Sequence, residues 1–112
     1  MAMMNVIIAE CLVDQDYVDN YTVGYKQLAE RAKTRTPELA EKITGIPAED
    51  IRQFAREYDT TTPAAIRLGV PLKRSYGGSQ GCRLVSCVPE LIDECRPGVG
   101  GSLQFPVWTH PT

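Results

Sequence analysis

The stretch PAAIRLGVPLKRSYGGSQ, residues 63–80, decides the fold that the sequence predicts. It opens with a short, mostly apolar run from Pro63 to Val70, which is typical of a strand. A basic turn follows, and the pair Gly77-Gly78 then opens a helical pattern at about Gln80. The order of strand, glycine turn and helix start is the order found at ligand sites in open α/β sheets.

The charge of this region indicates an anionic ligand. Between Thr60 and Pro89 there are four cations and no Asp or Glu, although the whole chain of 112 residues has a formal net charge of −2. A helix N-terminus offers unpaired N–H groups and a positive dipole end to a phosphate, and glycines let the backbone approach a ligand closely. The guanidinium of Arg74 can form two parallel hydrogen bonds with phosphate oxygens. The alternative is an ordinary surface turn whose cations are solvated.

The rest of the chain is predicted to be mostly helical. The segment from Met3 to Val13 is apolar nearly all round, so a helix there needs partners on several sides. Asp14 and Thr36 are expected helix N-caps, and Gly45 is an expected helix end. From Pro47 another helix is expected, with Ile51, Phe54, Ala55 and Tyr58 on its inner face. A last helix, bent or interrupted at Pro89, is expected from Gln80 to Ile92, followed by a glycine-rich loop at 97–101 and a tail at 103–108 that is extended or a loop.

Five stretches of this sequence resemble, in the same order, the large subunits of molybdopterin oxidoreductases of the dimethyl sulfoxide reductase superfamily. They are LVDQDYVDNYTVGY, TPELAEKITGIPAEDIRQFAREY, PAAIRLGVPLKRSYGGSQ, RLVSCVPEL and VGGSLQFPVW. The resemblance runs from near Met1 to about Trp108, but members of the family are several times longer. It therefore implies one partial domain over residues 1–112, an internal piece of the cofactor-binding region.

The expected fold class is α/β, a helix-rich partial three-layer (Rossmann-like) unit with one clear strand. One strand is incomplete as an isolated sheet, so its neighbours are expected from sequence outside this chain.

The resemblance also implies a cofactor, a molybdenum or tungsten ion held by two molybdopterin guanine dinucleotides and bound through the parent enzyme. Leu68, Gly69 and Val70 match the strand end that approaches one pterin dinucleotide, while Arg74, Gly78 and Gln80 match the loop that follows. The predicted cofactor-binding residues are Gly69, Val70, Arg74, Gly78 and Gln80. In context the segment is expected to help position the dinucleotide for electron or oxygen-atom transfer, with no turnover by itself.

No catalytic residue, metal ligand or iron–sulfur cluster is predicted within this segment. Cys11, Cys82, Cys87 and Cys95 show no CxxC pair, and the only histidine, His110, lies in a proline-rich tail. The partners that the resemblance implies are the remaining segments of the same enzyme and its iron–sulfur electron-transfer subunits. No transmembrane span is expected, and the sequence leaves a cytoplasmic and a periplasmic location equally open.

Two other hypotheses compete with this interpretation. The stretch PELAEKITGIPAEDIRQFARE has the layout of a DNA-binding helix-turn-helix, but Glu49, Asp50 and Glu57 on its second helix would repel phosphate. The chain could also be a non-catalytic relic of a truncated gene, since Asp93 and Glu94 place two acids near the expected pyrophosphate site. The open reading frames on either side would distinguish a split enzyme from a relic.

Overall fold

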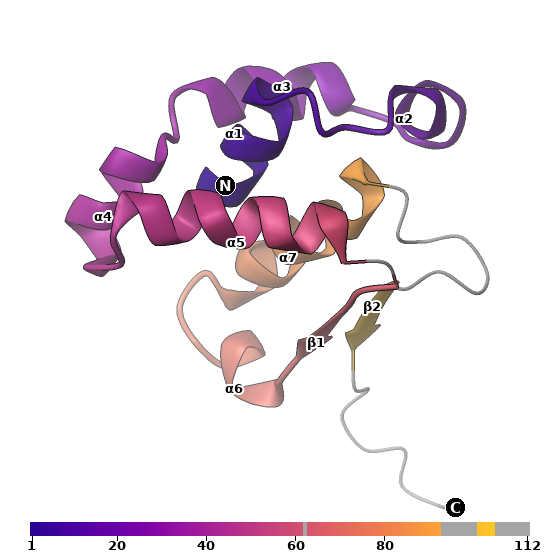
Figure 1. Ribbon diagram of the computed structural model, residues 1–112. Helices are drawn as coiled ribbons and strands as arrows, with labels where there is room; N and C mark the ends of the chain where they lie inside the picture. The colour runs from indigo at the N-terminus through magenta and orange to yellow at the C-terminus, as the bar shows by residue number, and fades with distance from the viewer. Residues whose placement is uncertain (62, 93–100, 105–112) are drawn as a thin grey trace, which may run out of the picture.

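The structure, a computed structural model, describes residues 1–61, 63–92 and 101–104. That part of the chain is mostly helical (Figure 1). In chain order the elements are α1 (Ala2–Ala9), α2 (Gln15–Tyr21), α3 (Tyr25–Lys33), α4 (Pro37–Thr44), α5 (Ala48–Thr60), β1 (Ala65–Leu68), α6 (Val70–Lys73), α7 (Gly78–Leu91) and β2 (Gly101–Gln104).

Local capping groups set several helix ends where the sequence predicted them. Asp14 Oδ1 accepts a hydrogen bond from the Tyr17 amide at 2.8 Å, and α2 begins there. Thr36 Oγ1 accepts from the Leu39 amide at 3.3 Å, with a proline in the first turn of α4. Gly45 ends α4 at φ 77°, a left-handed conformation that costs glycine little. The structure confirms these predictions. The sequence could supply them because each helix end depends on contacts within one helical turn.

The apolar helix α1 lies at the centre of the core. It packs against α3, α4, α5 and α7, as expected for a helix without a polar face (Figure 1). The buried core side chains are Met4, Val6, Ile7, Ala55, Tyr58, Val88 and Leu91. The predicted helix was too long, since α1 ends at Ala9 and the chain turns at Cys11, whose φ is 57°.

Three further details differ from the sequence prediction. Phe54 is 60% exposed although it was placed on the inner face of α5, where Ala55 and Tyr58 are buried. The turn after β1 contains the short helix α6. The last helix has the predicted extent, but α7 is not interrupted at Pro89, which was one of the two expected possibilities, and it continues to Leu91. Proline so close to a helix end removes only one hydrogen bond of the last turns, so the helix need not stop there.

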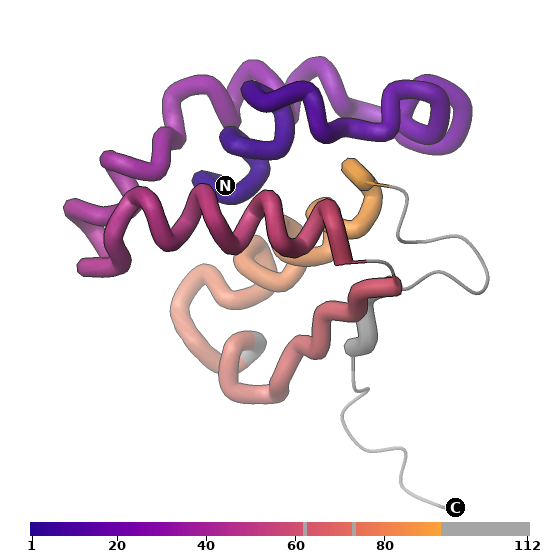
Figure 2. The backbone as a smooth tube through the Cα atoms, viewed as in Figure 1, coloured from indigo at the N-terminus to yellow at the C-terminus, as the bar shows by residue number. Residues whose placement is uncertain are grey.

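A βαβ unit holds the strand that the sequence predicted. β1 pairs in parallel with β2, with Ala65 opposite Gly101 and Leu68 opposite Gln104. The expectation that the neighbours of this strand come only from sequence outside the chain was therefore wrong for one of its edges. The backbone runs from β1 through α6 into α7 (Figure 2). Helix α7 contacts both strands and is the crossover helix between them. Two short strands do not form a sheet with layers on its faces, so the described residues show the helix-rich character but not the three-layer arrangement. Residues 93–100 and 105–112, which include Asp93, Glu94, Cys95 and His110, lie outside the described part.

Candidate functional site

The carboxyl end of β1 leads directly into the predicted ligand segment. Leu68 is the buried last residue of the strand, with 6% exposure. Gly69 follows in extended conformation as the exposed N-cap of α6. Val70 is half-buried as the first residue of that helix. The four-residue helix α6 therefore separates the strand from the start of α7.

The two glycines at the start of α7 serve different purposes. Gly77 is exposed, with φ 71°, so the backbone itself requires a residue that tolerates the left-handed region. Gly78 is buried, and a Cβ added there would lie 1.8 Å from the carbonyl oxygen of Leu72. Its amide donates to the Ser75 carbonyl at 2.9 Å. Gly78 thus allows the backbones of α6 and α7 to come into close contact.

The N-terminus of α7 leaves donors for a ligand. Gly77 provides no side-chain cap, and the Gly81 amide already donates to the Gly77 carbonyl at 3.0 Å. Helix geometry therefore gives the amides of Ser79 and Gln80, in the first turn, no partner within the helix. Arg74 is exposed at the end of α6, four residues before α7 begins. The segment offers amides, a guanidinium and a positive dipole end to an anion.

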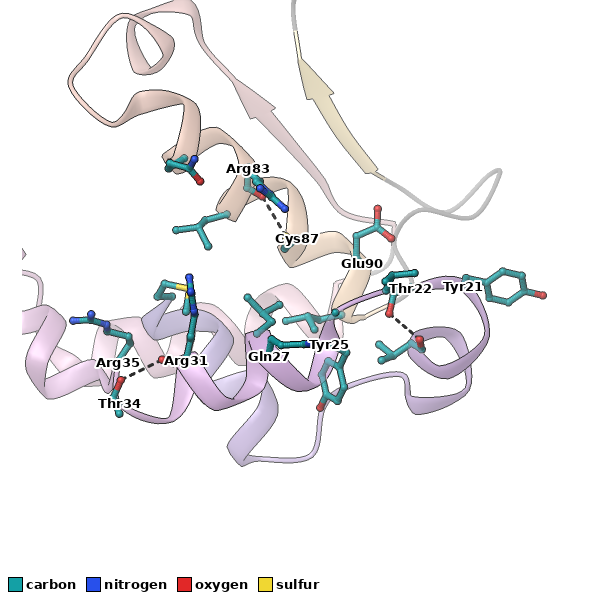
Figure 3. A pocket seen from close by; sticks show the side chains of 18 residues that line it. Tyr21, Thr22, Tyr25, Gln27, Arg31, Thr34, Arg35, Arg83, Cys87 and Glu90 are labelled. Atoms are coloured by element: carbon teal, nitrogen blue, oxygen red, sulfur yellow. Dashed lines mark hydrogen bonds between the residues drawn. The ribbon is translucent and has the colours of Figure 1, made fainter.

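A groove of about 990 Å³ opens beside this segment, between α2 and α3 on one side and α7 on the other (Figure 3). Of the five predicted site residues, Gln80 lines the groove, whereas Gly69, Val70, Arg74 and Gly78 do not. The structure therefore brings the five residues into one β1–α6–α7 unit without enclosing them in this groove.

Sequence reasoning missed the groove because its walls come from distant segments. Arg31 and Arg35 approach it from α3 and the turn after α3, and Arg83 approaches it from α7. One signal was available, since Leu28 and Arg31 are spaced i, i+3 and so share a helix face. No sequence pattern indicated that this face lies opposite α7.

The described residues contain no group of three His, Cys, Asp or Glu side chains that could hold a metal ion. Cys82 is buried on α7, Cys87 is half-buried and Cys11 is exposed. Over the same described ranges, no helix has the length and hydropathy needed to cross a bilayer.

The contacts of α5 count against the DNA-binding hypothesis. Arg56 forms two hydrogen bonds with the Glu10 carboxylate, at 2.8 and 2.7 Å, and this guanidinium holds the pKa of Glu10 below its usual value. Arg52 pairs with Glu38 and Glu49. The two cations of the presumed recognition helix are thus already paired with carboxylates, and its inner face is part of the core.

Comparison with known proteins finds relatives of this chain among oxidoreductases. The chain is 32% identical to the probable oxidoreductase YoaE of Bacillus subtilis over 93% of its length. It is 38% identical to the dimethyl sulfoxide reductase DmsA of Haemophilus influenzae and 37% identical to formate dehydrogenase H of Escherichia coli, in each case over 80% of its length. No family model matches the chain.

The share of each relative that is covered is small. The chain spans 15%, 14% and 13% of these three proteins, respectively, so it corresponds to one segment of a much larger subunit. The strand β1, the glycine turn and the start of α7 all lie within PAAIRLGVPLKRSYGGSQ, one of the stretches that carry the resemblance. The chain belongs to the dimethyl sulfoxide reductase superfamily of molybdopterin oxidoreductases, as a fragment of a large subunit.

Proposed function

We propose that this segment is one partial domain of the cofactor-binding region of a molybdenum or tungsten oxidoreductase, and that it contacts one pterin guanine dinucleotide. When bound, the two dinucleotides and their metal would supply two-electron redox or oxygen-atom transfer. The segment itself would bind and orient, without turnover of its own. The family relationship supports the enzyme class, and the β1–α6–α7 turn supports the contact.

The observation that carries the proposal is the junction between α6 and α7. Because Gly78 packs directly on the Leu72 carbonyl, the N-terminus of α7 is fixed close to the end of β1. The free amides of Ser79 and Gln80 then point out of the first turn, with Arg74 in the connection just before it. This donor set suits a diphosphate, which needs several N–H groups and at least one cation.

Each predicted residue has a distinct part in this proposal. Gly69 and Val70 would let the dinucleotide pass close to the strand end, since Gly69 is exposed and carries no side chain. Arg74 would pair with a phosphate, and Gln80 would donate or accept through its side-chain amide. Gly78 would act indirectly by holding α7 in place. The strands needed to complete a three-layer sheet around β1 and β2 would come from the remainder of the subunit, which would also contact iron–sulfur electron-transfer subunits.

The test uses a chimeric enzyme in which this segment replaces the matching segment of Escherichia coli formate dehydrogenase H. In that chimeric enzyme, Arg74→Ala should speed the loss of pterin and metal during mild heating by roughly tenfold, since a hydrogen bond to a charged group contributes about 1.5–3 kcal/mol. Metal is measured by mass spectrometry and pterin by the fluorescence of its oxidised form. Lys42→Ala, which removes an exposed cation from α4, is the matched control. Equal retention in the two variants would refute the proposed contact.

A further inference from the structure

The groove between α3 and α7 carries an unbalanced charge. Arg31, Arg35 and Arg83 line it, and none of the three takes part in the ion pairs found among the described residues. Figure 3 shows Arg31 rising from α3 toward α7, with Arg83 on the opposite wall. Guanidiniums gathered along one depression repel one another unless an anion lies between them.

One acid, Glu90, lines the same groove as the three cations, so it can offset only one of their charges, and it forms no ion pair with them among the described residues. Glu90 is near the end of α7, where one of its carboxylate oxygens accepts a hydrogen bond from the Tyr17 hydroxyl at 3.3 Å. On α3 itself, Glu30 pairs with Lys33 at 2.8 Å. The groove therefore remains a positively charged surface within a chain whose net charge is −2.

The floor of the groove is apolar. Val18 and Leu91 are buried there, with 3% and 2% exposure, and Leu28 and Leu84 are half-buried beside them. At its rim Tyr21 is 69% exposed. A free anion would use only the cations, whereas a polypeptide with acidic and apolar side chains would use the cations and the floor together.

We propose that this groove receives an acidic segment of the same large subunit, from the part of that polypeptide outside this chain. The relatives are so much longer that more than four-fifths of such a subunit lies elsewhere in its sequence. A segment of the same polypeptide is present at high effective concentration, so even a few ion pairs suffice to hold it. Its carboxylates would pair with Arg31, Arg35 and Arg83, and its apolar side chains would cover the floor. This inference does not depend on the cofactor contacts proposed above.

The first test compares the change in Tm that one double charge reversal causes in the chain alone and in the chimeric enzyme. In the chain alone, Arg31→Glu combined with Arg83→Glu removes the repulsion with Arg35, which lines the same groove, but it also puts an acid in the last turn of α3. These two effects oppose each other, so Tm should change little. In the chimeric enzyme the same double variant would repel the acidic segment, and Tm should fall by several degrees. Lys26→Glu combined with Lys42→Glu changes the charge equally at exposed positions outside the groove, so it should leave both Tm values nearly unchanged. An unchanged Tm of the chimeric enzyme after the groove reversal would overturn the proposal.

The second test asks whether polypeptide covers the groove. Cys87 lines it and is half-buried, so a maleimide should label this thiol in the chain alone. In the chimeric enzyme the labelling rate, read from the Cys87 peptide by mass spectrometry, should fall at least tenfold. The charge reversal at Arg31 and Arg83 should restore much of that rate. Equal labelling of the chain and the chimeric enzyme would overturn the proposal. A second result would also overturn it. If the double charge reversal lowered the pterin content of the chimeric enzyme while Cys87 stayed protected from labelling, the anion in the groove would be the cofactor and not an acidic segment.

Discussion

Replacing Gly78 by alanine tests whether the α6–α7 junction is as close as the structure indicates. The added Cβ would lie 1.8 Å from Leu72 O, 2.9 Å from Leu72 C and 3.0 Å from Ser75 Oγ. Since real Cβ atoms essentially never come within 3.0 Å of such neighbours, α6 and α7 would have to separate by about 1 Å or more. The nearest obstacle is a backbone carbonyl, which cannot rotate away as a flexible side chain could.

The expected magnitude follows from two opposing effects. Forcing an extra carbon into a packed contact costs about 1–3 kcal/mol. Alanine is favoured over glycine within a helix by roughly 0.5–1 kcal/mol, which offsets part of that cost. The net loss should be about 1–2 kcal/mol, which lowers Tm by roughly 5–10 °C for a domain of this size. Thermal and urea unfolding of the 112-residue chain, followed by circular dichroism, measures it.

Gly81→Ala is the matched control on the same helix. A Cβ at Gly81 would meet Leu72 Cδ1 at 3.7 Å, an ordinary van der Waals contact. The control should therefore gain the helix preference without the clash, and Tm should rise by a few degrees. A Gly78→Ala chain as stable as Gly81→Ala would refute the packing argument. If Gly78→Ala then released pterin from the chimeric enzyme, the glycine would serve the ligand directly.

Three further substitutions test other contacts by urea unfolding. Glu10→Gln should lower stability at neutral pH and weaken its pH dependence in the acid range. The hydrogen bonds from Arg56 lower the pKa of Glu10, so its stabilising contribution is complete above the usual value of 4.5 and is lost as the pH falls through the lowered pKa. Asp59→Asn should raise stability at neutral pH. Burial raises the pKa of the Asp59 carboxyl, so the protonated group favours the folded state at low pH, and this stabilisation is lost as the pH rises through the raised pKa. Asn5→Ala should cost about 1 kcal/mol, since Asn5 Nδ2 donates to the Ala32 carbonyl at 2.9 Å and joins α1 to α3.

The controls for these substitutions lie within single helices. Lys33→Ala removes an exposed pair with Glu30 on the same helix and should alter the acid-range pH dependence less than Glu10→Gln does. Asn20→Ala removes exposed hydrogen bonds to Asp16 one turn away and should cost less than Asn5→Ala. Equal losses at Asn5 and Asn20 would mean that the bridge between α1 and α3 contributes little. A lower neutral-pH stability for Asp59→Asn would contradict the sign derived from burial.

Helix ends and the position of β1 could be predicted from the sequence, because the groups that set them lie within a few residues of one another. Asp14 and Thr36 accept hydrogen bonds from amides three residues ahead, and Gly45 ends α4 by its own backbone freedom. The start of α7 next to Gly77 was predicted for the same reason. The family relationship was also available from the order of the matching stretches.

The closeness of α6 to α7, the exposure of Phe54 and the groove were decided only by the tertiary structure. A glycine pair in the sequence indicates a turn, but it does not show that Gly78 touches the Leu72 carbonyl while Gly77 needs a positive φ. Nor does a basic residue on α3 indicate that Arg83 of α7 lies across from it. Contacts between segments tens of residues apart depend on how the apolar faces pack around α1, and that packing is settled by the whole core at once rather than by any local pattern.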